Sequence, residues 1–365
     1  MDYRVLAVSP DLYGNLILTL DPNQMTSAFV RWALASTTSS KARNGCHPPK
    51  LYKIEFGMKN SSTNSSETEL LDYRKVLLAQ AISRVAKMIG HKVVGGYTNI
   101  TTDKITKNTV FVVGIPLAVN HQTIHPDEFS ESEKVLRLSM GNITANHGSQ
   151  TEVSLSEVLN ERLKAIKEIS ESRRLATLGL SSWAASAHNL ATATLQYDIL
   201  SKPLDVEILV PVLETNRMNH DALLIMYNYS RVLSILRRFD EHVKTGEYPN
   251  LPCLPDISFT TIYTKEEELQ LLQTVMEWPR ILDIVINFTQ LEINVGIVTK
   301  FLLALTKAFN SFYYEVVVLV PTNAPHNFPG MMARIYLLKS VCSVIENCLD
   351  VLQINHADTP ILHEN

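Results

Sequence analysis

The last third of this sequence carries long apolar stripes at helical spacing. Between residues 220 and 245, Ile225, Tyr229, Val232, Leu236 and Phe239 recur at steps of four and three residues. Residues at these steps lie on one face of an α-helix, so the pattern predicts an amphipathic helix that packs on a core. Similar stripes predict further helices over residues 265–289, 295–319 and 328–353, and Pro279 must break or kink the first of these three. We therefore expect an all-α bundle over residues 216–365.

The first half of the chain alternates between two kinds of pattern. Short β-type runs predict strands at residues 16–20, 51–56, 91–94, 110–115 and 134–140, and longer amphipathic runs predict helices at 25–35, 67–90 and 155–171. Such alternation is typical of an α/β layer. We expect an α/β domain over residues 1–172, a helical connector rich in small residues over 173–215, and an α+β protein overall.

Composition limits the kinds of partner and compartment. The net charge of -4 over 365 residues argues against a strongly basic nucleic-acid binder, although a local basic patch suffices for RNA. The four cysteines are scattered without a Cys-x-x-Cys pair, which favours a reducing compartment, and we expect a cytoplasmic protein. The start of the sequence lacks a signal-peptide pattern, and no stretch reaches the roughly 20 apolar residues of a membrane span.

Basic and aromatic residues recur on the faces of the predicted helices that are turned away from the core stripes. Tyr227, Arg231 and Arg238 share one such face, displaced by about 200° from the stripe of the first helix. Cations that bind phosphates and aromatic rings that stack on bases hold single-stranded RNA. The candidate RNA-binding residues are therefore Tyr227, Arg231, Arg238, Lys300, Lys307, Arg334, Tyr336 and Lys339.

The same faces have a plainer interpretation as the solvated surface of a bundle. Acidic residues outnumber basic ones in this part of the chain, so composition alone favours that interpretation. Arg231 has a further alternative, because arginines near a core often serve helix packing and pair with carboxylates.

Three strings in the bundle resemble the DALR anticodon-binding domain of arginyl-tRNA synthetases. They are Tyr227-Asn-Tyr-Ser-Arg231, Ala308-Phe-Asn-Ser-Phe-Tyr313 and Ala333-Arg-Ile-Tyr-Leu-Leu338, and they occur in the order of that domain. In the synthetases an arginine usually follows the second string by four residues, where this chain has Val317. Gly246-Glu-Tyr-Pro-Asn-Leu-Pro252 adds a closer resemblance to a family of DALR-domain relatives of the synthetases.

A weaker resemblance extends upstream to the class I synthetase nucleotide fold. In working synthetases a His-x-Gly-His element contacts ATP at the start of the first helix, where this chain has Thr68-Glu-Leu-Leu-Asp-Tyr-Arg74. A Lys-Met-Ser signature stabilises charge on the phosphates, and Ala145-Asn-His-Gly-Ser-Gln-Thr-Glu152 stands in its place without a lysine. We expect a degenerate, Rossmann-like domain that does not catalyse aminoacylation.

The resemblance implies a non-catalytic adaptor without a cofactor. Members of that family bind arginine tRNAs and deliver them to a methyltransferase that makes 3-methylcytidine in the anticodon loop, so these are the expected partners, with no DNA and no membrane. Two alternatives stay open. One is a divergent arginyl-tRNA synthetase with rebuilt ATP signatures, and the other is a protein-interaction scaffold that has lost RNA binding.

Other chemical motifs give no functional prediction. His121 and His125 have the spacing of a helical metal pair, but Pro126 follows at once and no third ligand is near, so we expect no metal site. The sequence has no Walker or Rossmann glycine loop and no methyl-donor loop. The chain is therefore not expected to be the methyltransferase itself.

Overall fold

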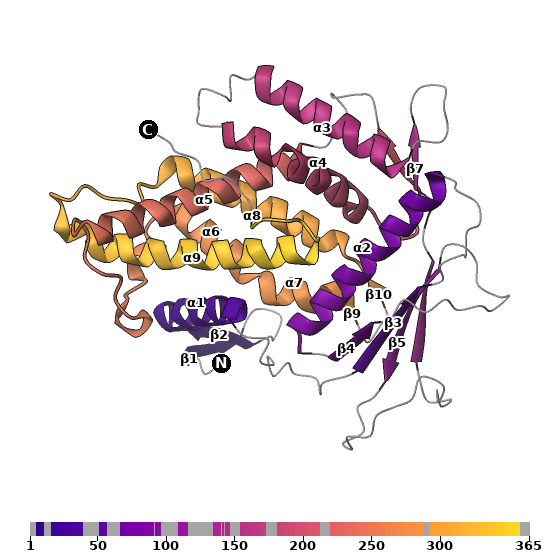
Figure 1. Ribbon diagram of the computed structural model, residues 1–365. Helices are drawn as coiled ribbons and strands as arrows, with labels where there is room; N and C mark the ends of the chain where they lie inside the picture. The colour runs from indigo at the N-terminus through magenta and orange to yellow at the C-terminus, as the bar shows by residue number, and fades with distance from the viewer. Residues whose placement is uncertain are drawn as a thin grey trace.

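The structure is a computed structural model. It describes residues 5–10, 16–38, 51–56, 66–90, 92–95, 109–115, 134–139, 141, 143–146, 154–172, 181–211, 220–287 and 292–357. In this part of the chain the protein is mostly helical, with a few short strands (Figure 1). His121 and His125, where we expect no metal site, and the stretch 147–152 lie outside the described residues.

The C-terminal part folds as the helical bundle that the stripes predict. Its helices are α5 (Asp221–Lys244), α6 (Glu266–Met276), α7 (Trp278–Val285), α8 (Gly296–Glu315) and α9 (Phe328–Val351). The single helix expected over 265–289 is divided at Glu277, because Pro279 at the start of α7 cannot donate the backbone hydrogen bond that a continuous helix needs. The apolar stripe of α8 is buried as expected, with Val298, Leu302, Leu305, Phe309 and Phe312 all in the core.

Short connections in the bundle follow from local sequence. Gly246 ends α5 with a φ of 81°, a left-handed backbone that glycine adopts at little cost. Short 3-10 turns at Leu254–Asp256, Thr260–Tyr263 and Pro325–Asn327 and the two-residue strands β9 (Ile286–Asn287) and β10 (Glu292–Ile293) complete this part.

Helices of the first half pack directly on the bundle. Helix α1 (Pro22–Thr38) lies along α9, and the hydroxyl of Ser343 donates a hydrogen bond of 2.7 Å to the carbonyl of Ala33 (Figure 1). Helix α2 (Ser66–Met88) also contacts α9 and crosses toward the strands. One hydrophobic core therefore runs continuously from Phe29 to Ile354, and the domain boundaries at residues 172 and 215 remain predictions.

Two more helices cover the side of the bundle near α5 and α8. Helix α3 (Leu155–Ser172) begins with a capping box, in which Ser154 and Glu157 each accept a hydrogen bond from the other's backbone N–H. Helix α4 (Ser181–Ser201) packs between α3 and the bundle, and the hydroxyl of Tyr197 donates to the carbonyl of Thr299. The connector helix is thus part of the core.

The strands form small sheets of mixed direction. In the four-stranded sheet β4–β3–β5–β6, β3 (Leu51–Phe56) is parallel to β4 (Lys92–Gly95) but antiparallel to β5 (Thr109–Ile115), which is antiparallel to β6 (Lys134–Ser139). Strands β7 (Ile143–Asn146) and β8 (Ile208–Pro211) form a parallel pair, and β1 (Val5–Pro10) and β2 (Leu16–Leu20) form an antiparallel hairpin. A Rossmann domain needs a mainly parallel sheet, so the described strands do not confirm the expected Rossmann remnant.

One segment in the described part of the chain is long and apolar enough to cross a membrane, contrary to the expectation from sequence. It is Pro325–Val351, which contains α9, and 72% of its apolar window is buried inside the protein. Its neighbours α1, α2, α5, α6 and α8 supply that cover, which is the situation of a central core helix.

Candidate nucleic-acid interface

Arg231 lies between α5 and α8 rather than on a solvated face. Its side chain is only 8% exposed, and its Nη1 donates a hydrogen bond of 3.3 Å to Oδ1 of Asn310 on α8. Ser234, one turn further along α5, is also buried. The expectation that this face points away from the core is therefore wrong for Arg231, because α8 packs against it. Arg238 is exposed, as expected.

Tyrosine rings surround the Arg231 guanidinium. Its central carbon lies 4.3 Å from the ring centroid of Tyr227, 4.4 Å from that of Tyr313 and 5.6 Å from that of Tyr314. Its Nη2 also donates a hydrogen bond of 2.8 Å to the Tyr227 hydroxyl. Burial on its own lowers the pKa of Arg231, but the tyrosine hydroxyls, Tyr314 first, outweigh it and the pKa is raised. The guanidinium thus lies against aromatic faces, which attract cations electrostatically.

Helix α8 presents a positive and aromatic stripe to solvent. Lys300, Lys307 and Tyr314 are exposed and recur at steps of seven residues, so they lie along one face opposite the buried stripe. Ala304 and Ser311, which are also exposed, fill the positions between them. The predicted exposure of Lys300 and Lys307 is confirmed, and no acidic residue stands at these stripe positions of α8.

Arg334 on α9 has a structural partner. Its Nε lies 2.5 Å from Oε1 of Glu268, a carboxylate on α6 that is 0% exposed. Its Nη1 also donates a hydrogen bond of 3.4 Å to the carbonyl of Val317, just after α8. Burying a carboxylate is costly unless it is paired with a cation and hydrogen-bonded. Arg334 therefore serves the packing of α6 against α9, whatever else it contacts.

Tyr336 is turned inward as well. Its side chain is 9% exposed, and its hydroxyl donates a hydrogen bond of 2.7 Å to the carbonyl of Pro252. The expectation that it lies on an accessible face is wrong, because the proline-rich connection between α5 and α6 covers it. Lys339, one turn further along α9, is half-buried.

Two cations bind backbone carbonyls at the end of α8 and just after it. Nζ of Lys265 donates a hydrogen bond of 3.0 Å to the carbonyl of Glu315, and Arg334 reaches the carbonyl of Val317. These carbonyls lie at the C-terminal end of a helix, where cations are favoured. Sequence reasoning missed the role of Lys265, since only the fold brings the start of α6 to the end of α8. The roles of Asn310 and Tyr313 were missed for the same reason. Tyr314 could have been found from the sequence, because it lies on the same face of α8 as Lys300 and Lys307.

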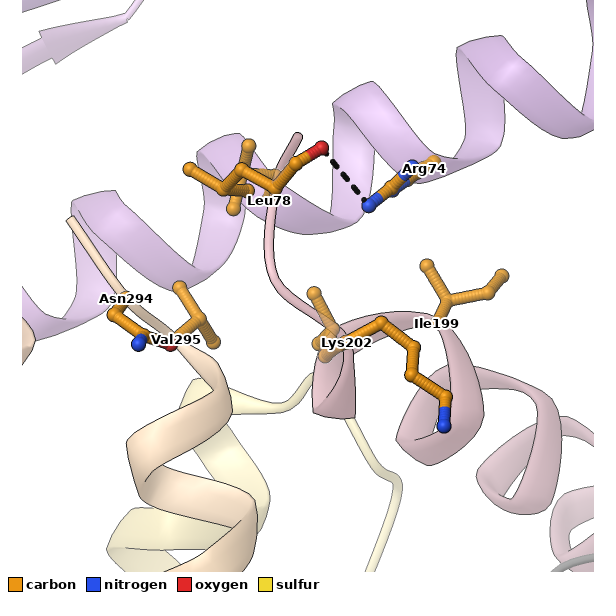
Figure 2. A pocket seen from close by; sticks show the side chains of 8 residues that line it. Arg74, Leu78, Ile199, Lys202, Asn294 and Val295 are labelled. Carbon is orange, nitrogen blue, oxygen red and sulfur yellow. Dashed lines mark hydrogen bonds between the residues drawn. The ribbon is translucent and has the colours of Figure 1, made fainter. Parts of the chain in front are cut away.

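The stretch compared by sequence with the ATP-binding element of synthetases ends at Arg74, which is buried in α2. Arg74 donates hydrogen bonds to the carbonyls of Gly141, Pro203, Leu204 and Val206. Burial lowers the pKa of Arg74 to about 10. Figure 2 shows the small pocket beside it, which is lined by Arg74, Leu78, Ile199, Leu200, Lys202, Leu204, Asn294 and Val295. The Arg74 guanidinium thus has backbone carbonyls as its hydrogen-bond partners. Among the described residues, no cluster of three or more metal-ligating side chains is found.

Solved structures share this architecture. The chain is similar to the arginyl-tRNA synthetase of Thermus thermophilus, with a TM-score of 0.59 and 13% identity over 98% of this chain and 88% of that one. It is similar to the arginyl-tRNA synthetase of Plasmodium falciparum with the same TM-score, at 12% identity over 98% and 86% of the two chains. The protein therefore has a fold of the arginyl-tRNA synthetase class.

The bundle carries a more specific match. Residues 225–359 match the sequence model of the DALR anticodon binding domain. Curated relatives include the DALR anticodon-binding domain-containing protein 3 of Rattus norvegicus, 25% identical over 47% of this chain and 33% of that protein, and that of Danio rerio, 22% identical over 56% and 38%. The arginine–tRNA ligase of Clostridium perfringens is 32% identical over 36% of this chain and 20% of that protein. The match thus spans between 20% and 38% of the length of these curated relatives.

Proposed function

We propose that this protein binds tRNA through its DALR bundle and does not aminoacylate it. The observation that carries this proposal is the exposed stripe of α8, with Lys300, Lys307 and Tyr314, inside the segment that matches an anticodon binding domain. Lysines on such a stripe attract phosphates, and binding of this kind weakens as salt rises. Arg238, exposed on the neighbouring α5, is proposed to extend the same positive surface.

In this proposal, most of the remaining candidate residues stabilise the binding surface through contacts within the protein. Arg231, Arg334 and Tyr336 already have partners within the protein, so we assign them to positioning. Tyr227, which is half-buried against Arg231, and Lys339 remain proposed contacts at the edges of the surface.

The finer part of the proposal concerns the cargo and its destination. We propose that arginine tRNAs are preferred and that the bound tRNA is delivered to a tRNA 3-methylcytidine methyltransferase in the cytoplasm. The support is the similarity to relatives named as DALR domain proteins and as arginine–tRNA ligases. The absence of the synthetase ATP signatures from the sequence supports a non-catalytic role, and Arg74 is committed to backbone carbonyls at one of those places.

Charge reversal on α8 tests the binding surface. The double variant Lys300→Glu/Lys307→Glu should lower tRNA affinity about tenfold or more at fixed salt. It should also reduce the slope of log affinity against log salt by about 1.5, as expected for two lost phosphate contacts. The matched control is Lys164→Glu/Lys167→Glu, which reverses two exposed lysines on α3. Equal loss in both double variants would mean that binding follows net charge and not this surface.

Enzyme assay separates the proposal from a divergent synthetase. ATP–pyrophosphate exchange with arginine and tRNA should stay at the level of a reaction without protein. Exchange above that level would contradict the non-catalytic assignment.

Co-purification with the methyltransferase in the presence and absence of tRNA tests the delivery step, and a complex that never contains tRNA would favour a protein scaffold.

A further inference from the structure

Several large apolar side chains are exposed in the described part of the chain, and Tyr314 is the aromatic one among them. It is 67% exposed, and Val317, three residues further on, is 68% exposed. Tyr313, the tyrosine of the string shared with synthetases, is half-buried against Phe309 and the Arg231 guanidinium. Tyr313, the tyrosine of the shared string, is therefore used in packing, and the next residue, Tyr314, is exposed to solvent.

The exposed ring is held by contacts on two sides. Tyr313 and Tyr314 meet edge to face, with ring centroids 5.7 Å apart and planes at 83°, and Arg231 lies 5.6 Å from the Tyr314 centroid. On the other side, Lys265 and Arg334 bind the carbonyls of Glu315 and Val317, which follow the ring. An exposed ring with a fixed backbone loses little conformational freedom when a ligand stacks on it.

Around Tyr314, cations outnumber the adjacent exposed carboxylate of Glu315. Arg231, Lys265 and Arg334 converge on residues 314–317, and Lys307 is exposed two turns earlier on the same face. Glu268, the carboxylate nearest to Arg334, is fully buried and already ion-paired. An aromatic face next to several cations suits a stacked base with a phosphate on each side, and suits an apolar protein partner less well.

We propose that Tyr314 forms a stacking platform for an unpaired nucleobase of RNA, and that Arg231, Lys265 and Arg334 are positioning residues that hold it. The inference rests on the proposed function, because it names the element of the bundle that contacts a base and not the phosphate backbone. Every nucleobase has a π face, so the platform selects unpaired over paired nucleotides and does not read sequence.

The test compares substitutions at position 314 in the full chain. The probe is the anticodon stem-loop of an arginine tRNA that carries 2-aminopurine at one loop position at a time, and a blunt RNA duplex of the same length is the comparison. Tyr314→Ala should weaken binding of the stem-loop about 5- to 100-fold, as loss of one stacked base does, and should leave duplex binding unchanged. Tyr314→Phe should retain wild-type affinity because the ring is kept.

Two further readouts distinguish stacking from a structural role. The salt slope should be the same for Tyr314→Ala and the wild-type protein, since no phosphate contact is lost, whereas Lys307→Met should reduce it by about 1. Quenching of 2-aminopurine at one loop position should disappear in Tyr314→Ala and persist in Tyr314→Phe. Leu209→Ala, which shortens another exposed apolar side chain on β8, is the matched control.

The outcomes separate the platform from the proposed function. If the wild-type protein binds the stem-loop and Tyr314→Ala binds equally well, the platform is wrong and tRNA binding stands. If the wild-type protein binds no RNA, both are wrong. If Tyr314→Ala leaves RNA binding intact but abolishes binding of the methyltransferase, the surface is a protein contact and the inference is overturned.

Discussion

Nη1 of Arg74 on α2 lies 2.6 Å from the carbonyl oxygen of Gly141, just before β7, although 67 residues separate them in the chain. The same guanidinium binds three carbonyls between Pro203 and Val206, in the connection from α4 to β8. One side chain thereby joins a helix of the first half to the β7–β8 pair and to the end of the connector helix.

Removing that guanidinium should destabilise the protein strongly. Arg74 is 2% exposed, so Arg74→Met removes four hydrogen bonds that a buried, charged donor makes to backbone carbonyls. We expect a loss of about 2–4 kcal/mol, because hydrogen bonds from charged donors contribute about 1.5–3 kcal/mol each and are not additive. Urea unfolding measures the change. The control Arg84→Met, on the same helix but about half exposed, should change the midpoint little. Equal midpoints for the two variants would refute the assigned role of Arg74.

Gly141 should tolerate no side chain. A Cβ added there would lie 2.3 Å from backbone atoms of Val206, which cannot move aside as a flexible side chain could. Gly141→Ala should therefore cost about 1–3 kcal/mol. Gly330→Ala is the matched control, since its Cβ would meet ordinary contacts at 3.8 Å in the first turn of α9. Thermal unfolding of both variants checks this, and a wild-type Tm for Gly141→Ala would contradict it.

The Arg334–Glu268 pair should behave as a buried ion pair. Arg334→Met leaves the fully buried Glu268 carboxylate without a cation, so we expect a loss of about 3–5 kcal/mol. The double variant Glu268→Leu/Arg334→Met should recover most of that loss, because both charges are gone. A double variant as unstable as Arg334→Met alone would show that the arginine acts through its other contacts.

The contacts of His356, near the C-terminal end of the described chain, should stabilise the protein more at lower pH. His356 lies 3.4 Å from Asp350 and packs edge to face on Tyr229, with Glu346 and Arg84 also near. The hydrogen bond to Asp350 raises the pKa of His356, and the same bond lowers that of Asp350.

The sign follows from the raised pKa of His356. Its contribution to folding is complete below the unfolded pKa of about 6.5 and disappears as pH rises through the higher folded value. The stability difference between wild type and His356→Gln should therefore shrink from about pH 6 to about pH 9, a range in which Asp350 stays ionised. Urea titrations across this range test it, and a constant difference would contradict it.

Local patterns predicted much of the fold. The strands at residues 16–20 and 51–56 and the helices that begin near Leu155, Asp221 and Phe328 lie where apolar spacing put them. The break near Pro279 followed from the missing backbone donor of proline. Sheet direction was not predictable, because strand patterns do not say which strands pair or in which sense. The mixed β4–β3–β5–β6 sheet therefore differs from the expected Rossmann form.

The candidate site was only partly predictable for a related reason. Helical spacing says which residues share a face, but not whether another helix covers that face. Lys300 and Lys307 lie on an uncovered face, whereas α8 covers Arg231 and the proline-rich connection covers Tyr336. Lys265 gains its role from the meeting of α6 and α8, which no local pattern encodes.

The most direct test of the central claim is recovery of tRNA by the purified full chain. The protein is incubated with total tRNA at fixed near-physiological salt, recovered, and the bound RNA is sequenced beside that from the Lys300→Glu/Lys307→Glu variant. Salt is fixed because phosphate contacts make affinity steeply dependent on it. The account predicts enrichment of arginine tRNAs by the wild-type protein and loss of that enrichment in the variant. Recovery of no tRNA above a carrier-protein control would contradict it.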